Sequence, residues 1–116
     1  MLNLNEHPDQ LAISLTGELT IQNAEAVKAG LLDALGRGKA MTLDLANISE
    51  LDSAGVQLLY YAKKMAEAEQ LSLQLLNHSP AVVEVFELYH LAPVFGDPIV
   101  LAANPAGSAQ GPGGRP

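Results

Sequence analysis

The chain has 116 residues, a formal net charge of −7 and no cysteine. This length predicts one domain that buries its own core, and the lack of cysteine excludes a disulfide framework and thiol chemistry. The acidic charge argues against binding to nucleic acid or to anionic membrane surfaces, so we expect the partner to be a protein.

The first half of the chain alternates strand and helix patterns. Apolar residues occupy every second position over 11–15 and again over 41–45, which predicts two strands that each bury one face. The first of these is expected to close at Gly17 and to pair with a short strand at the N-terminus. Between them, apolar positions recur at helical spacing over 23–35, with Asn23 as the expected N-cap.

The second half repeats this alternation. The longest helical pattern covers 53–69, and an alternating strand follows over 71–75. A third helix begins with Ser79 as its cap, and Tyr89 is expected on its apolar side. A short last strand is expected over 99–102.

Strands that alternate with helices predict an α/β fold with a mixed or largely parallel sheet. Because the strands alternate cleanly, we expect the helices mainly on one face of the sheet, with the other face more open. We place the domain at 1–103 and expect 104–116, which is rich in glycine and proline, to be a disordered tail.

Two features favour a cytoplasmic location and no direct insertion into a membrane. The N-terminal segment lacks the basic and apolar regions of a signal peptide. No apolar run reaches the ~20 residues that span a bilayer.

The tetrapeptide Asp52-Ser53-Ala54-Gly55 places a hydroxyl where the strand over 41–45 and a short loop lead into the long helix. The first N–H groups of a helix lack intrahelical partners and carry the positive end of its dipole, so a phosphate on Ser53 would be received favourably. Asp and Ser are also preferred N-cap residues, so simple capping is the alternative.

Other chemistry has little support in the sequence. There is no glycine-rich phosphate-binding motif, and the histidines lack metal-ligand spacing, so neither a cofactor nor a metal is expected. A serine hydrolase would need His78 or His90 to reach Ser53. Leu51 also stands where a nucleophile elbow requires glycine.

Several segments together resemble the STAS domain of anti-sigma factor antagonists. They are Gly17-Glu18-Leu19-Thr20, Leu43-Asp44-Leu45 and the segment from Ile48 to Gly55, followed by the closing segments 77–80 and 91–95. The resemblance implies a STAS-like mixed sheet of four to five strands, flanked by helices. It places Ser53 at the phosphoacceptor position.

The resemblance also implies a partner, a serine kinase of the anti-sigma type that binds while Ser53 is unmodified. The kinase would supply ATP and Mg²⁺, so this chain would be a substrate and a binding module, not an enzyme. The partner-binding residues that it implies are Thr20, Ile21, Gln22, Asn23, Asp52, Ser53, Ala54, Gly55, Val56 and Gln57.

One position departs from the family pattern. The family often has Asp where this chain has Thr20, which removes a carboxylate from the loop expected near Ser53. Stand-alone STAS proteins also accompany chemotaxis proteins or serve as a small subunit of a lipid ABC transporter, and segments 77–80 and 95–98 most resemble the chemotaxis-associated group. A constitutive adaptor subunit is therefore the alternative. The sequence predicts neither the partner's identity nor the oligomeric state.

Overall fold

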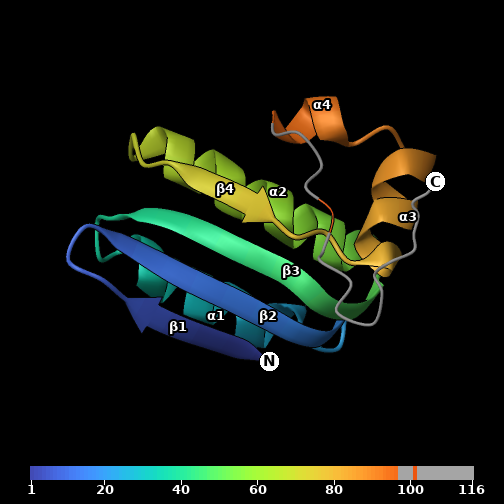
Figure 1. Cartoon of the computed structure of the whole chain (residues 1–116), viewed down its shortest axis with the longest axis horizontal. Helices are drawn as coiled ribbons and strands as arrows, with labels where there is room; N and C mark the ends of the chain where they lie inside the picture. The colour runs from blue at the N-terminus through green and yellow to red at the C-terminus, as the bar shows by residue number, and fades with distance from the viewer. Residues whose placement is uncertain (97–100, 102–116) are drawn as a thin grey trace.

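The computed structural model describes residues 1–96 and 101. Its strands are β1 (Leu2–Glu6), β2 (Gln10–Leu19), β3 (Ala40–Leu51) and β4 (Leu73–Leu76). They form one sheet in the order β1-β2-β3-β4, with β1 antiparallel to β2 and the other pairs parallel (Figure 1). The predicted α/β fold with a mixed sheet is confirmed.

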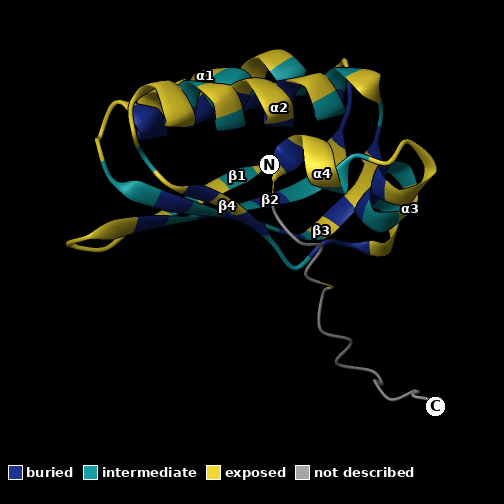
Figure 2. Ribbon diagram, turned by 90° about the horizontal axis from the view of Figure 1, so that it is seen from above, coloured by how far each residue is buried: buried dark blue, intermediate teal, exposed yellow. Residues whose placement is uncertain are grey.

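Two long helices cover one face of this sheet. They are α1 (Ala24–Leu35), between β2 and β3, and α2 (Ser53–Ala68), between β3 and β4. Figure 2 shows the two helices side by side along the same face. The strands explain the arrangement, because Leu11, Ile13 and Leu15 are fully buried beneath the helices whereas the residues between them are only half-buried.

β3 is longer than the strand predicted over 41–45, and the predicted loop before α2 is absent, since a single residue separates the two elements. The buried residues of β3 are two positions apart up to Leu45, but then three apart, at Ile48 and Leu51. Two register shifts against β2 lie in this part of the strand. At each shift β3 has one extra residue, as in a β-bulge, where two residues of one strand face a single residue of the other. The alternation of buried residues is therefore lost although the strand continues.

β2 also continues beyond the predicted end at Gly17 and reaches Leu19. Gly17 has φ +93°, in the left-handed region that favours glycine, and it lies at the second register shift. The extension brings the carbonyl of Leu19 to the start of α2.

Two shorter helices, α3 (Pro80–Leu88) and α4 (Ala92–Phe95), complete the described fold. Ser79 caps α3 as predicted, because its hydroxyl oxygen accepts the Val82 N–H at 3.3 Å. Phe95 of α4 is buried and stacks on Phe86 of α3, with ring centroids 4.9 Å apart. It also meets the Tyr60 ring of α2 edge-on at 6.0 Å, so three helices share one aromatic cluster.

The prediction that Tyr89 lies on the buried side of the third helix is wrong, because this side chain is 66% exposed. The helix ends at Leu88, and His90 adopts a left-handed φ of +54°. The Leu91 N–H then returns to the carbonyl of Phe86 at 2.8 Å, the bond that closes a Schellman-type helix end. Tyr89 therefore lies on the turn and not on the inner face.

Two predictions fall mainly outside the described residues. Of the last strand, expected over 99–102, only Leu101 is described, and it forms an isolated parallel bridge with His78. The tail expected over 104–116 lies entirely outside.

Candidate functional site

Ser53 is the first residue of α2 and is exposed. Asp52 precedes it with an extended backbone and occupies the N-cap position, where its Oδ1 accepts the Gly55 N–H at 2.9 Å. Capping is therefore carried out by Asp52, and the Ser53 hydroxyl lies outside the cap.

The second carboxylate oxygen of Asp52 reaches a different segment. Its Oδ2 accepts the backbone N–H of Ile21 at 3.0 Å, in the turn over 20–23 that joins β2 to α1. The turn closes on itself, because the Thr20 carbonyl accepts the N–H groups of Asn23 and Ala24, both at 2.9 Å. The Asp52 side chain thus joins the turn over 20–23 to the start of α2, the two segments predicted to bind a partner.

Asn23 stands at the N-cap position of α1, as predicted, but its side chain does not cap the helix. Its Nδ2 instead donates to the carbonyl of Glu18 at 2.7 Å. The bond ties the turn back to the end of β2.

The backbone N–H groups that bind the Asp52 carboxyl lower its pKa below the ordinary value. The largest cause is the N–H of Gly55, and the next is the N–H of Ile21. Both donors stabilise the charged form, so Asp52 is ionised at neutral pH.

Gly55 allows α2 to begin this close to the sheet. A Cβ at this position would lie 2.2 Å from the carbonyl oxygen of Leu19 and 2.7 Å from Cδ1 of Leu51. Backbone and buried side chain leave no room for a methyl group, so glycine is required by close approach rather than by an unusual φ.

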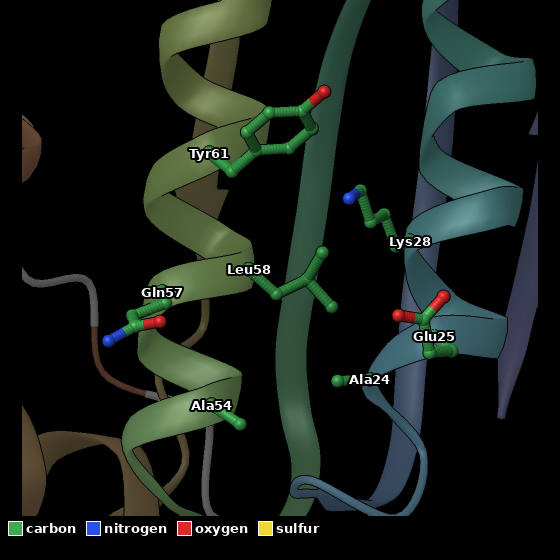
Figure 3. A pocket seen from close by; sticks show the side chains of 7 residues that line it. All are labelled: Ala24, Glu25, Lys28, Ala54, Gln57, Leu58 and Tyr61. Carbon is green, nitrogen blue, oxygen red and sulfur yellow. The ribbon is translucent and has the colours of Figure 1, made fainter.

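A groove of about 360 Å³ lies between α1 and α2 on one side of this junction. Figure 3 shows Lys28 of α1 and Tyr61 of α2 extending toward each other across it. The Lys28 ammonium lies 4.9 Å from the centre of the Tyr61 ring, within cation–π range. Ala54 and Gln57 complete the part of the groove nearest Ser53.

A larger groove, of about 580 Å³, lies between α2 and α3. Its lining includes Ser53 together with a set of apolar side chains, namely Val56, Val85, Leu88, Tyr89 and Leu91. Leu88 and Tyr89 are adjacent in the chain and are 65% and 66% exposed, so with the other lining residues they present apolar surface to solvent. The serine hydroxyl therefore stands beside an open apolar surface.

The ten residues predicted to bind a partner lie in two segments that the structure brings together. Ile21, Gln22, Ser53 and Gln57 are exposed. Thr20 and Gly55 are buried, so their contribution is to the geometry of the site. Asn23, Asp52, Ala54 and Val56 are half-buried.

Sequence reasoning missed the side chains that flank these segments. Lys28 and Tyr61 have no special spacing relative to Ser53, and only the packing of α1 against α2 brings them into one groove with Ala54 and Gln57. Leu88 and Tyr89 were missed because helical spacing does not reveal the left-handed turn at His90 that ends α3.

The geometry gives little support to other chemistry at Ser53. The described residues that line the α2–α3 groove include no histidine, and His78 is buried against the Phe86 ring. No group of three or more potential metal ligands occurs among residues 1–96 and 101. No helix in the same residues has the length and apolar character needed to cross a membrane.

Comparison with known proteins gives a consistent result. A family model described as "Mlab, STAS domain" matches residues 2–100. The anti-sigma-B factor antagonist of Bacillus subtilis (strain 168) is 22% identical over 109 residues, which are 94% of this chain and 96% of that protein.

Two solved structures of one protein are similar throughout the fold. The anti-sigma factor antagonist SpoIIAA in its unphosphorylated form has a TM-score of 0.69 and 27% identity, over 86% of this chain and 88% of that chain. SpoIIAA in the phosphorylated form, described as a Bacillus cell fate determinant, has a TM-score of 0.65 and 26% identity, over 86% and 91%.

Proposed function

The chain belongs to the STAS domain family, and from this premise we propose that it is a phosphorylation-switched protein-interaction module of the anti-sigma factor antagonist type. In this proposal a serine kinase of the anti-sigma type binds the chain while Ser53 is unmodified, and a phosphate on Ser53 releases it. The kinase supplies ATP and Mg²⁺, so the chain is a substrate and a binding surface, not an enzyme. The similarity to SpoIIAA, known in both states, supports this proposal.

One observation carries the proposal. Ser53 is exposed at the start of α2. Its hydroxyl is not needed to cap the helix, because Asp52 is the capping residue. A kinase can therefore reach the hydroxyl without breaking the cap. The exposed Ile21 lies on the turn that Asp52 binds, so both segments are available to one partner.

The charges around Ser53 favour a switch that acts on the partner. A phosphate adds about −1.5 to −2 charges. The Gly55 N–H that would help to receive it is already bound to the charged Asp52, so the helix offers the phosphate limited compensation. A partner that packs against Ser53 would have to desolvate this charge, and a penalty of about 3 kcal/mol already weakens binding more than a hundredfold.

The test begins with phosphopeptide mapping of the protein from its native cells and identification of the co-purifying partner. Binding of the purified partner is then measured for the wild type, Ser53→Ala and Ser53→Asp. We expect Ser53→Ala to bind like the wild type and Ser53→Asp to bind at least a hundredfold more weakly.

A matched control is Ser72→Asp. Ser72 is also exposed, but it lies at the opposite end of β3 from Ser53. Its carbonyl accepts the N–H of Met41 at 2.8 Å, at the start of β3, whereas Ser53 follows the end of that strand. The control should bind normally, and all variants should keep the wild-type unfolding midpoint. Equal binding by Ser53→Asp and the wild type would contradict the switch.

The second candidate is a constitutive adaptor subunit of a chemotaxis complex or a lipid ABC transporter. Thr20 favours the adaptor, because the turn near Ser53 has no carboxylate at this position. The Thr20 side chain is also buried. An unmodified Ser53 in cells, with a stable complex that tolerates Ser53→Asp, would select this candidate.

A further inference from the structure

We propose that the α2–α3 groove beside Ser53 binds an amphipathic helix of the partner, with an apolar ridge in the groove and a lysine or arginine directed to Glu84. The inference rests on the proposed function and adds to it the chemistry of the partner segment.

The groove exposes apolar surface in a form suited to binding. Leu88 and Tyr89, both about two-thirds exposed, project at the end of α3, and Val56, Val85 and Leu91 line the groove with them. Exposed apolar surface of this kind marks interaction sites on small domains. A few well-packed residues near the centre of an interface, often tyrosines, supply most of its binding energy.

The end of α3 and its packing against α2 are fixed before a partner arrives. The Leu91 N–H bonds to the Phe86 carbonyl at 2.8 Å and closes the end of α3. Phe86 is in turn stacked on Phe95, which also contacts the α2 residue Tyr60. Because this cluster ties the two walls of the groove together, little backbone entropy is lost when they are bound.

The shape and charge of the groove select its occupant. A partner helix can lay the apolar side chains at positions i, i+3 and i+4 into a groove between two helices, and about 580 Å³ accommodates several of them. The charged residues in the lining are Asp52 and Glu84, and no lysine or arginine is among the described lining residues. Since both Asp52 oxygens already accept backbone N–H groups, Glu84 is the acid that faces a partner cation.

Ser53 connects the groove to the switch. Ser53 lines the same cavity as Val56 and Leu88, so a helix seated there would lie next to the hydroxyl. A phosphate would place charged oxygens against the apolar ridge of the partner, where they lose water without gaining donors. A phosphate already on Ser53 and a helix seated in the groove therefore exclude each other.

The experiment is photocross-linking of the full chain in its native cells, with benzoylphenylalanine in place of Leu88, Ile21 or Leu32. These are exposed aliphatic positions in the groove, in the turn over 20–23 and on α1, respectively. We expect Leu88 and Ile21 to capture the same protein and Leu32 to capture none of it. The peptide joined to position 88 should carry apolar residues at helical spacing with a flanking lysine or arginine.

Binding of that purified partner then tests the contacts. Leu88→Ser should weaken it at least tenfold, and Glu84→Lys should slow association and flatten its dependence on salt. The circular dichroism melting curves of both variants should match that of the wild type, since both residues are exposed.

Each other outcome overturns a different statement. Capture from Ile21 alone would reject the groove and leave the proposed function intact. Capture from neither position, or equally from Leu32, would reject both. A cross-link from position 88 to a second copy of the chain, or to a segment without this apolar and basic pattern, would reject the inference. So would capture of a protein from position 88 that Ile21 does not also capture.

Discussion

The backbone N–H of Ile21 donates to the Asp52 carboxylate at 3.0 Å, across 31 positions of the chain. The same carboxylate caps α2 through Gly55. The geometry of the turn over 20–23 is therefore set by a residue adjacent to Ser53, and the two segments form one surface rather than two.

Replacement of Asp52 should separate these two bonds. Asp52→Asn keeps one oxygen acceptor, which can still cap α2. It places an NH₂ group where the second carboxylate oxygen accepts the N–H of Ile21. We expect faster amide hydrogen exchange at Ile21 in this variant, with Gly55 still protected, whereas Asp52→Ala should expose both amides. Unchanged exchange at Ile21 in Asp52→Asn would show that the bond does not hold the turn.

The stability of the protein should depend on the charge of Asp52. The ordinary pKa of this carboxyl is 3.8, and hydrogen bonds from Gly55 and Ile21 lower the pKa in the folded state. The charged form therefore stabilises the fold above about pH 4, and this contribution is lost as the pH falls through the lower, folded pKa. The urea midpoints of the wild type and Asp52→Asn should differ at pH 7 and approach each other in acid.

Glu6 must be controlled in that measurement. Lys39 and then Arg37 lower the pKa of its carboxyl through hydrogen bonds, so its contribution has the same sign and is also lost in acid. The comparison is therefore repeated in a Glu6→Gln background. A difference between the two proteins that stays constant from pH 7 to pH 2 would contradict the role given to Asp52.

Gly55→Ala and Gly30→Ala should have opposite effects. At Gly55 the new methyl group meets the Leu19 carbonyl oxygen at 2.2 Å, so the start of α2 must move, with a loss of about 2 kcal/mol or more. At Gly30 it meets only the end of the Leu2 side chain, at 2.9 Å, which can turn aside. Alanine in this helix interior should then be neutral or stabilise by up to about 1 kcal/mol. Urea unfolding measures both, and a stable Gly55→Ala would refute the close approach.

Phe95→Ala should destabilise the fold strongly although α4 is short. Phe95 is 2% exposed and contacts both Phe86 and Tyr60, so its removal opens a cavity that costs about 3 to 5 kcal/mol. The near-ultraviolet circular dichroism of the tyrosines should weaken as well. Phe95→Leu is the milder control, and equal losses in the two variants would argue against a specific aromatic cluster.

The strands were predictable wherever one face is buried. Leu11, Ile13 and Leu15 alternate with half-buried residues because helices lie on only one side of β2. The end of β3 was missed because its buried residues Ile48 and Leu51 follow a spacing of three. A bulge depends on pairing with a distant strand, and local alternation does not report it.

The start of α2 was readable from local chemistry, since aspartate and serine are typical capping residues. Local chemistry left open which of them caps, and the bond between Ile21 and the second oxygen of Asp52 depends on how the chain folds over 31 positions. Tyr89 was misplaced for a related reason, because helical spacing does not reveal that His90 adopts a left-handed conformation. The roles of the partner-binding residues remain predictions.

The two bulges of β3 also limit how the length of this chain can change during evolution. Over their paired length β3 has 12 residues and β2 has 10, and six positions separate the buried Leu45 and Leu51. Loss of one residue between them would remove one of the two extra residues of β3 and shift Leu51 and the following junction by one position against β2. Homologues that keep the Asp52–Ser53 junction should therefore keep the length of this segment, and accept insertions in the turn between β1 and β2 instead.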